Sequence, residues 1–399
     1  MSLPRRPPQS PPPPGRLRTH LRGSHALARV AAVSYVAATL VGVVMRFELV
    51  GAGVGAPFDH LLHAHSHTLY FGWAALGALA GGMPTFPRVT PTLGRTAIGL
   101  VVGVPLLFVG FLVVGYSPVT IAVSTLVMVG WYLAAASWWR QTAGLDRTAT
   151  VAFRGGLVYL VASSLGVWVL AALRAGGGGT TLQEGLAVHA FLVGFGWFFV
   201  FAVVGLLVQH AERLGLRLDV ASVQRSLRWW LGLAWITFPL DVDGGPEVGG
   251  LGSAARLAGI LLIVPGARWV WTMWRGAMPG PTRALHRLAA MWFGLATVGA
   301  AGAAVFGTPA LVAAGRQGIV IHLHALFVGF VTSSLVLVLT DAAPNRALRL
   351  HHIGLSVMLV ALALVPLSDP EPGLWMAAAG ATVLWLAGVG WARAITVRR

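Results

Sequence analysis

Three histidines in this chain are each followed five positions later by a glycine and then by an aromatic residue. They are His67, His189 and His324, which lie 122 and 135 residues apart. A small residue lets two membrane helices pack closely, and that packing alone would explain the glycines. It does not explain a histidine in every copy, because ionisable side chains inside a membrane are costly and usually functional. We therefore expect these histidines to be ligands, with helix packing alone as the alternative.

Two of the three copies carry a second histidine two positions earlier, His65 and His322. Two residues turn an α-helix by about 200°, so His322 and His324 point to nearly opposite sides and cannot bind one metal together. Each can bind a different metal. Haem iron accepts axial imidazoles on its two faces, so a haem between two facing helices needs one histidine from each helix. The predicted spans 59–83 and 318–341, which carry His65, His67, His322 and His324, can supply these two histidines.

A different geometry is available to His60, His63 and His67, which follow one stripe of a helix at positions i, i+3 and i+7. Adjacent members of such a stripe can chelate a small metal such as copper or zinc. The alternative is that His60 and His63 are solvent-exposed residues at the membrane surface, without a metal.

The composition excludes most soluble classes of protein. Hydrophobic residues make up 56% of the chain and charged residues only 10%, whereas a soluble domain carries about 25% charged residues. The net charge of +16 therefore does not indicate nucleic-acid binding. The chain has no cysteine, which excludes disulfides, iron–sulfur clusters and Cys-ligated zinc.

Twelve apolar stretches are long enough to cross a bilayer as helices, which takes about 20 residues each. Their limits are 26–49, 59–83, 95–115, 118–139, 151–173, 185–210, 227–242, 251–274, 286–307, 318–341, 350–367 and 373–393. If both termini are cytoplasmic, 24 of the 28 basic residues, all of them Arg, fall on the inside. This asymmetry satisfies the positive-inside rule and predicts a multi-pass protein of a bacterial-type inner membrane.

The predicted organisation is a disordered, Pro/Arg-rich cytoplasmic tail over 1–24 and one all-α, twelve-helix membrane domain over 25–399. Each interval between the histidine motifs holds four predicted spans, so the domain divides into units of roughly 25–147, 148–275 and 276–399. The motif marks the second span of each unit, near its outer end. The six remaining histidines are expected at the cytoplasmic interface, without a site; they are His20, His25, His210, His286, His351 and His352.

These motifs resemble the haem–copper oxidase subunit I superfamily, which has twelve helices in three quasi-equivalent groups of four. The resemblance implies that His322 is proximal to a high-spin haem. It also implies that His324 ligates a low-spin haem together with His67 or His65, and that His189 stands at the family's copper or iron position. This chain departs from the family's pattern in two ways, and both argue against a complete proton-pumping oxidase. The family's paired histidines on the seventh helix are missing, since residues from Trp229 to Pro239 include none, and no acidic residue lies deep in a span.

The segments Leu62-His63-Ala64-His65 and His324 to Gly329 also look like those of NnrS-type proteins. Those are twelve-span haem- and copper-containing membrane proteins associated with nitric-oxide metabolism and denitrification. Their motif commonly continues with His-Glu-Met, where this chain has His65-Ser66-His67.

The leading hypothesis is a haem-binding inner-membrane protein of the haem–copper oxidase/NnrS type, with one or two haems and copper as an optional metal. It would handle electrons or a diatomic gas, NO or O2, near the outer face, as a possible oxidoreductase. Its expected partners are the lipid bilayer and a cytochrome or other electron donor. The first alternative is a bis-His electron carrier without gas chemistry. The second is a non-haem metal handler or transporter that uses the histidines of residues 60–67.

Overall fold

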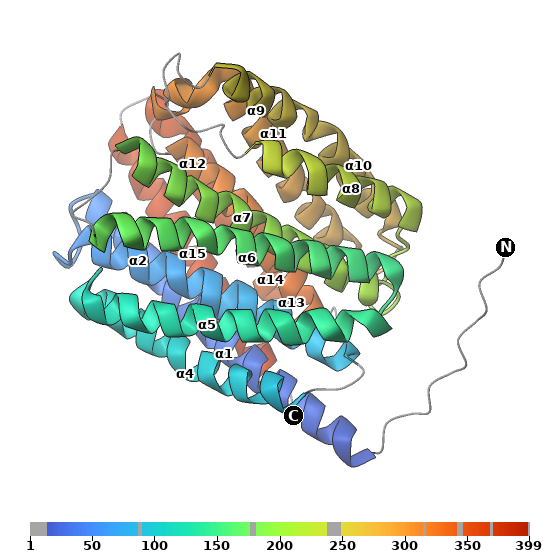
Figure 1. Ribbon diagram of the computed structural model, residues 1–399. Coiled ribbons are helices and arrows are strands. Elements are labelled where there is room, and N and C mark those ends of the chain that lie inside the picture. The colour runs from blue at the N-terminus through green and yellow to red at the C-terminus, as the bar shows by residue number, and fades with distance from the viewer. Residues whose placement is uncertain are drawn as a thin grey trace.

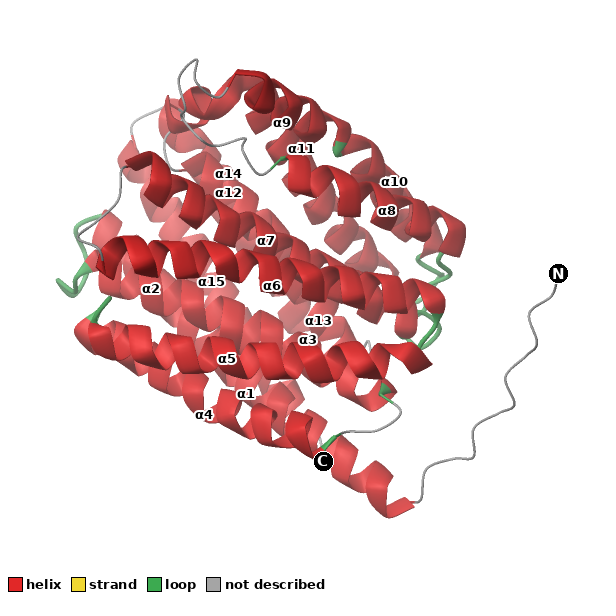
Figure 2. Cartoon of the chain, in the orientation of Figure 1, coloured by secondary structure: helices red, strands yellow, loops and turns green. Residues whose placement is uncertain are grey.

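The computed structural model describes residues 14–86, 90–175, 181–237, 249–313, 317–340, 346–367 and 370–397. Within these ranges the chain is almost entirely helical and forms no strand, apart from an isolated bridge between Leu216 and Ala277. Figure 1 shows the helices side by side in one bundle, and Figure 2 shows that the loops between them are short. The predicted all-α class is confirmed.

The first unit contains helices α1 to α5. They are α1 (Pro14–Leu49), α2 (Phe58–His67), the π-helix η1 (Thr68–Ala75), α3 (Leu76–Gly82), the short η2 (Met83–Thr85), α4 (Pro91–Val114), α5 (Pro118–Gln141) and the short η3 (Thr142–Gly144). Helix α2, η1 and α3 form one continuous rod over the predicted span 59–83.

The stretches predicted as the second and third units are helical too. The second comprises α6 (Arg147–Ala175), α7 (Thr181–Gln209), α8 (Val220–Ile236), α9 (Gly249–Leu261) and α10 (Ile263–Gly276). The third comprises α11 (Arg283–Ala313), α12 (Gln317–Leu323), the π-helix η5 (His324–Thr332), α13 (Ser333–Leu339), α14 (Arg346–Leu364), the short η6 (Val365–Leu367) and α15 (Pro370–Val397).

Nine helices in the described part are long and apolar enough to cross a membrane. They are Gly23–Leu49, Pro91–Val114, Pro118–Gly144, Arg147–Leu173, Ala190–Gln209, Ser253–Gly276, Val320–Leu339, Arg346–Leu364 and Pro370–Val397. The other three predicted spans, 59–83, 227–242 and 286–307, begin on helical stretches too, and residues 238–242 lie outside the described ranges. The chain is therefore a multi-pass helical membrane protein.

Helix α1 begins at Pro14, ten residues before the predicted end of the disordered tail. Residues 1–13 of that tail lie outside the described part. Proline is favoured in the first turn of a helix, because its missing N–H would have no partner there and its φ angle suits the helix. Leu17 and Arg18 are good helix formers. Helix α1 therefore continues toward the N-terminus, through a stretch whose proline and arginine content predicted disorder.

The glycine of each histidine motif brings the second helix of its unit against the first helix. A Cβ atom added at these glycines would collide with Ser34 of α1 at Gly72, with Ser163 of α6 at Gly194, and with Trp292 of α11 at Gly329. The same helix pair is thus closely packed in all three units. This accounts for the glycines as packing residues, as the sequence suggested.

Candidate functional site

The second helices of the three units meet through an aromatic cluster. Tyr70 of η1 lies with its ring centre 5.9 Å from that of Phe195 of α7 and 5.1 Å from that of Phe327 of η5. Phe199 of α7 also contacts Phe327, at 5.5 Å. The three motif-bearing helices are therefore neighbours.

Both helices with two motif histidines change to π-helical winding at or just after them. The π-helix η1 starts at Thr68, directly after His67, and η5 starts at His324 itself. The two are joined by a hydrogen bond of 2.8 Å in which Trp73 Nε1 donates to Thr332 Oγ1. Short π-helical segments occur frequently at functional sites, because the extra residue per turn re-aims the side chains around it.

His65 and His324 face each other across the space between these two helices. Their ring centres are 6.4 Å apart and their planes are only 18° from parallel. Both rings keep some accessible surface although they lie inside the bundle. Of the two partners that the sequence left open for His324, the structure brings His65 to it.

A backbone carbonyl holds each of these rings in place. His65 Nδ1 is 2.8 Å from the carbonyl oxygen of Ala38 on α1, and His324 Nδ1 is 2.8 Å from that of Val320, one turn earlier on its own helix. A carbonyl can only accept, so each Nδ1 carries the proton and donates it. The lone pair is then on Nε2. This is the tautomer of a histidine that is ready to bind a metal, with an outer hydrogen bond that fixes its orientation.

The same hydrogen bonds recur at equivalent positions of the first and third units. His322 Nδ1 lies 3.0 Å from the carbonyl of Ala296 on α11, as His65 does from that of Ala38 on α1. His67 Nδ1 lies 3.0 Å from the carbonyl of His63, four residues earlier, as His324 does from that of Val320. The internal repeat therefore extends from the sequence to the side-chain conformations. It makes His65 the counterpart of His322, and His67 the counterpart of His324.

His67 points to a different neighbour from His65. Its ring centre is 4.5 Å from that of Phe111 on α4 and 5.8 Å from that of His63. The divergence of two residues on one helix, expected from the 200° rotation, is thus observed. His67 consequently does not face His324.

The histidine stripe of α2 does not converge as a three-ligand site. His60 Nδ1 lies 3.3 Å from the carbonyl of Leu112, and the ring of His63 contacts Phe111 and Tyr116. Within the described residues, no group of three or more histidine, cysteine or acidic side chains is arranged to hold a metal ion. The pair His63 and His67 is what remains of the predicted copper or zinc site. His189 lies on α7, and its side chain is outside what the structure describes.

Two residues next to His65 belong to the site and were not singled out from the sequence. A Cβ atom on Gly42 of α1 would lie 2.8 Å from His65 Cε1, so only glycine leaves room for the ring at this point. Arg46, one turn further along α1, is half-buried, and its charge acts on both His65 and His324. The sequence could have pointed to Arg46, because it is one of only four arginines that the predicted topology places on the outer side of the membrane.

Three of the histidines expected at the cytoplasmic side are buried between helices. His351, with 0% exposure, accepts a 3.3 Å hydrogen bond from Tyr35 and donates one of 3.0 Å to the carbonyl of Val328. His352 accepts a 3.0 Å hydrogen bond from Trp292 Nε1. His286 lies 2.8 Å from the carbonyl of Leu214. At these turns α14 and α11 are covered by neighbouring helices, and the histidine rings join those helices together.

Of the repeated histidines whose side chains the structure describes, His65 and His324 thus form one pair, each with its proton on Nδ1, and the charge of Arg46 acts on both. In comparisons with known proteins, no family model and no curated protein sequence matches this chain.

Proposed function

We propose that this protein binds haem between His65 and His324 and carries electrons near the outer face of an inner membrane. The single observation that carries the proposal is the separation and near-parallel arrangement of the two rings. A metal binds an imidazole nitrogen at about 2.0–2.1 Å, and the ring centre lies about 1.2 Å behind that nitrogen, so two axial rings on one iron would have centres about 6.4–6.6 Å apart. The observed 6.4 Å fits this spacing.

The chain's own residues would hold such a group in three ways. The carbonyls of Ala38 and Val320 fix the two rings and make each Nε2 more basic, which strengthens the bond to iron. Gly42 leaves space for the His65 ring. Arg46 offers a positive charge to the carboxylates that a haem carries. A haem with two axial imidazoles supplies one-electron transfer, because neither face is open to a further ligand.

The direct test is the reduced-minus-oxidised absorption spectrum of the purified full-length protein, together with its haem content. We expect a Soret band and the sharp visible bands of a six-coordinate haem. A purified, folded protein that contains no haem and takes none up would refute the proposal.

The architecture proposed for this function is that of the haem–copper oxidase and NnrS types: twelve spans in three units, with both termini cytoplasmic. Two features support it. The motif glycine packs the second helix against the first in every unit, and the histidine hydrogen bonds repeat between the first and third units. A soluble or membrane cytochrome is the proposed electron donor. If copper is bound as well, His189 is its proposed ligand.

Removing the positive charge of Arg46 is expected to weaken haem binding and to lower its midpoint potential. The Arg46→Gln variant loses a charge that acts on both axial histidines. A positive charge near the iron favours the reduced state, so its removal shifts the potential downward, on the order of tens of millivolts. Potentiometric titration followed at the visible bands measures this shift. The variant Arg256→Gln, also placed outside by the predicted topology, is the control and should leave the potential unchanged.

Binding of a diatomic gas at a second haem on His322 is the second candidate function. It is favoured by one observation, the hydrogen bond from His322 to Ala296, which repeats that of His65. We expect carbon monoxide to change the spectrum of part of the reduced haem, and the His322→Ala variant to lose that change while it keeps the six-coordinate bands. If carbon monoxide leaves the reduced spectrum unaltered, gas binding is contradicted and only electron transfer remains.

A further inference from the structure

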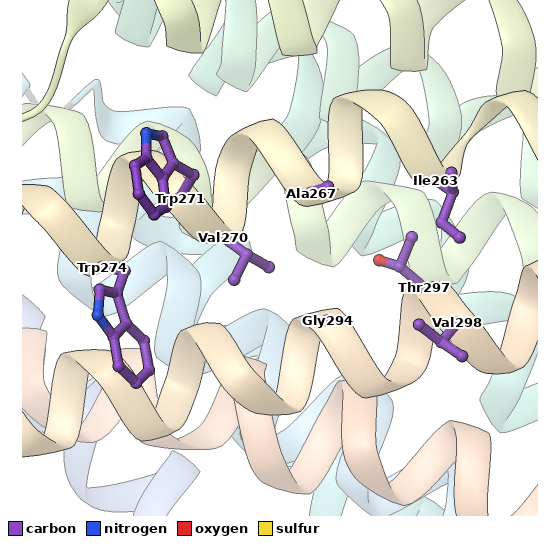
Figure 3. A pocket seen from close by; sticks show the side chains of 8 residues that line it. All are labelled: Ile263, Ala267, Val270, Trp271, Trp274, Gly294, Thr297 and Val298. Carbon is purple, nitrogen blue, oxygen red and sulfur yellow. The ribbon is translucent and has the colours of Figure 1, made fainter.

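A groove on the outside of the bundle lies between α10 and α11. Figure 3 shows the side chains that line it, from Ile263 to Trp274 on α10 and from Gly294 to Val298 on α11. Its volume is about 340 Å³, within the range of roughly 300–1,000 Å³ that holds small molecules. The lining is apolar except for Thr297, whose hydroxyl donates to the carbonyl of Phe293. The groove therefore fits a hydrocarbon and offers no polar group along its length.

The groove faces the lipid rather than a neighbouring helix. Trp271 and Val298 on its rim are each 57% exposed, and Val264 and Leu295 beside it are exposed too. From Ile263 to Trp274 the groove runs along about three turns of α10, or roughly 16 Å at about 1.5 Å per residue. One leaflet contributes about half of the hydrocarbon core, which is about 30 Å thick. The groove thus has the length of one acyl chain.

Two arginines stand at the Trp271/Trp274 end of this groove. The guanidinium of Arg275 lies 4.4 Å from the ring centre of Trp271, and that of Arg287 lies 4.7 Å from the ring centre of Trp274. Arg287 Nε is buried without a hydrogen-bond partner among the described residues. The aromatic faces hold the two cations in position without neutralising them. An arginine pair of this kind is suited to a phosphate group, which accepts two hydrogen bonds from one guanidinium.

This end of the groove belongs to the basic end of the bundle. The turn between α10 and α11 is joined to the start of α8, where the backbone N–H of Arg217 donates to the carbonyl of Gly276. Arg213 lies in the loop before α8, and Arg283 is the first residue of α11. By the positive-inside rule this end faces the cytoplasm. The cytoplasmic leaflet is rich in anionic lipids, whose charge is complementary to these arginines.

We propose that the groove binds one anionic phospholipid of the cytoplasmic leaflet. One acyl chain lies between α10 and α11, and the phosphate contacts Arg275 and Arg287. Trp271 and Trp274 sit at the level of the headgroup, where tryptophans are enriched in membrane proteins. The bound lipid fastens α10 to α11, the helix whose Ala296 carbonyl orients His322. The site does not depend on whether the protein binds haem.

The test counts retained lipids on the full-length protein by native mass spectrometry. The probes are phosphatidylglycerol and phosphatidylcholine with identical acyl chains, added to delipidated protein in detergent. We expect one phosphatidylglycerol per chain, bound about tenfold more tightly than phosphatidylcholine, because two arginines recognise its net negative charge. Equal retention of the two lipids would overturn the proposal.

Two sets of variants separate the headgroup contact from the groove. Arg275→Gln with Arg287→Gln should abolish the preference for phosphatidylglycerol. The control pair Arg225→Gln with Arg228→Gln removes the same charge from exposed positions of α8 at the same end, and should keep the preference. Ala267→Leu fills the groove with both arginines intact and should reduce the retention of phosphatidylglycerol about tenfold. If the arginine pair matches its control, or if Ala267→Leu retains lipid as the unaltered protein does, the site is refuted.

Discussion

Replacing His65 with alanine is expected to abolish the six-coordinate haem spectrum, whereas replacing His67 leaves it in place. The reason is geometric, because His65 faces His324 at 6.4 Å while His67 packs against Phe111. Loss of one axial ligand leaves a five-coordinate iron or no bound haem. The expected effect is therefore close to complete loss of the sharp visible bands, in His65→Ala and in His324→Ala alike.

His67→Ala is a matched control for this experiment, since it removes the same side chain two residues away on the same helix. Haem content and the visible spectrum are measured on all three purified variants, with far-ultraviolet circular dichroism to confirm the helical fold. A spectrum that survives in His65→Ala and disappears in His67→Ala would reverse the assignment of the ligand. If the haem spectrum survives in both His65→Ala and His67→Ala, neither histidine of α2 is a haem ligand.

Gly42→Val is expected to mimic the loss of His65 without removing any ligand. A Cβ atom at this position already lies 2.8 Å from His65 Cε1, and the branched side chain of valine adds two methyl groups there. The ring would have to leave the carbonyl of Ala38, and the facing arrangement with His324 would be lost. We expect haem content to fall about tenfold or more, with conversion of the remaining haem to a five-coordinate form.

Gly99→Val provides the comparison for this prediction. Gly99 lies on α4, within a membrane-spanning helix as Gly42 does, and a Cβ atom there meets nothing within 4 Å. This variant should keep the full haem content. If Gly42→Val keeps it too, the close approach of α1 does not determine the position of the His65 ring.

The helices could be predicted from the sequence because they depend on local patterns. Runs of apolar residues define the membrane helices, and the distance from each histidine to its glycine is the same in every unit. The glycines were also correctly interpreted as packing residues, since Gly72, Gly194 and Gly329 each meet the first helix of their unit. These features need no knowledge of how distant parts of the chain are arranged.

The pairing of the histidines could not be predicted in the same way. Helix periodicity shows that His65 and His67 diverge, but not which of them faces His324. That depends on how α2 is rotated against α1, which is set by Ala38 and Gly42 some 25 residues earlier. The burial of His351 has a similar origin, because its partner Tyr35 lies 316 residues away.

Electron paramagnetic resonance of the oxidised full-length protein tests the proposed haem ligation most directly. Axial imidazoles with near-parallel planes give a rhombic low-spin signal, whereas perpendicular planes give a highly anisotropic one. With the rings of His65 and His324 only 18° from parallel, the predicted result is a rhombic low-spin signal that is absent from His65→Ala. A protein whose haem gives only a high-spin signal, or whose rhombic signal persists without His65, would contradict ligation by this pair.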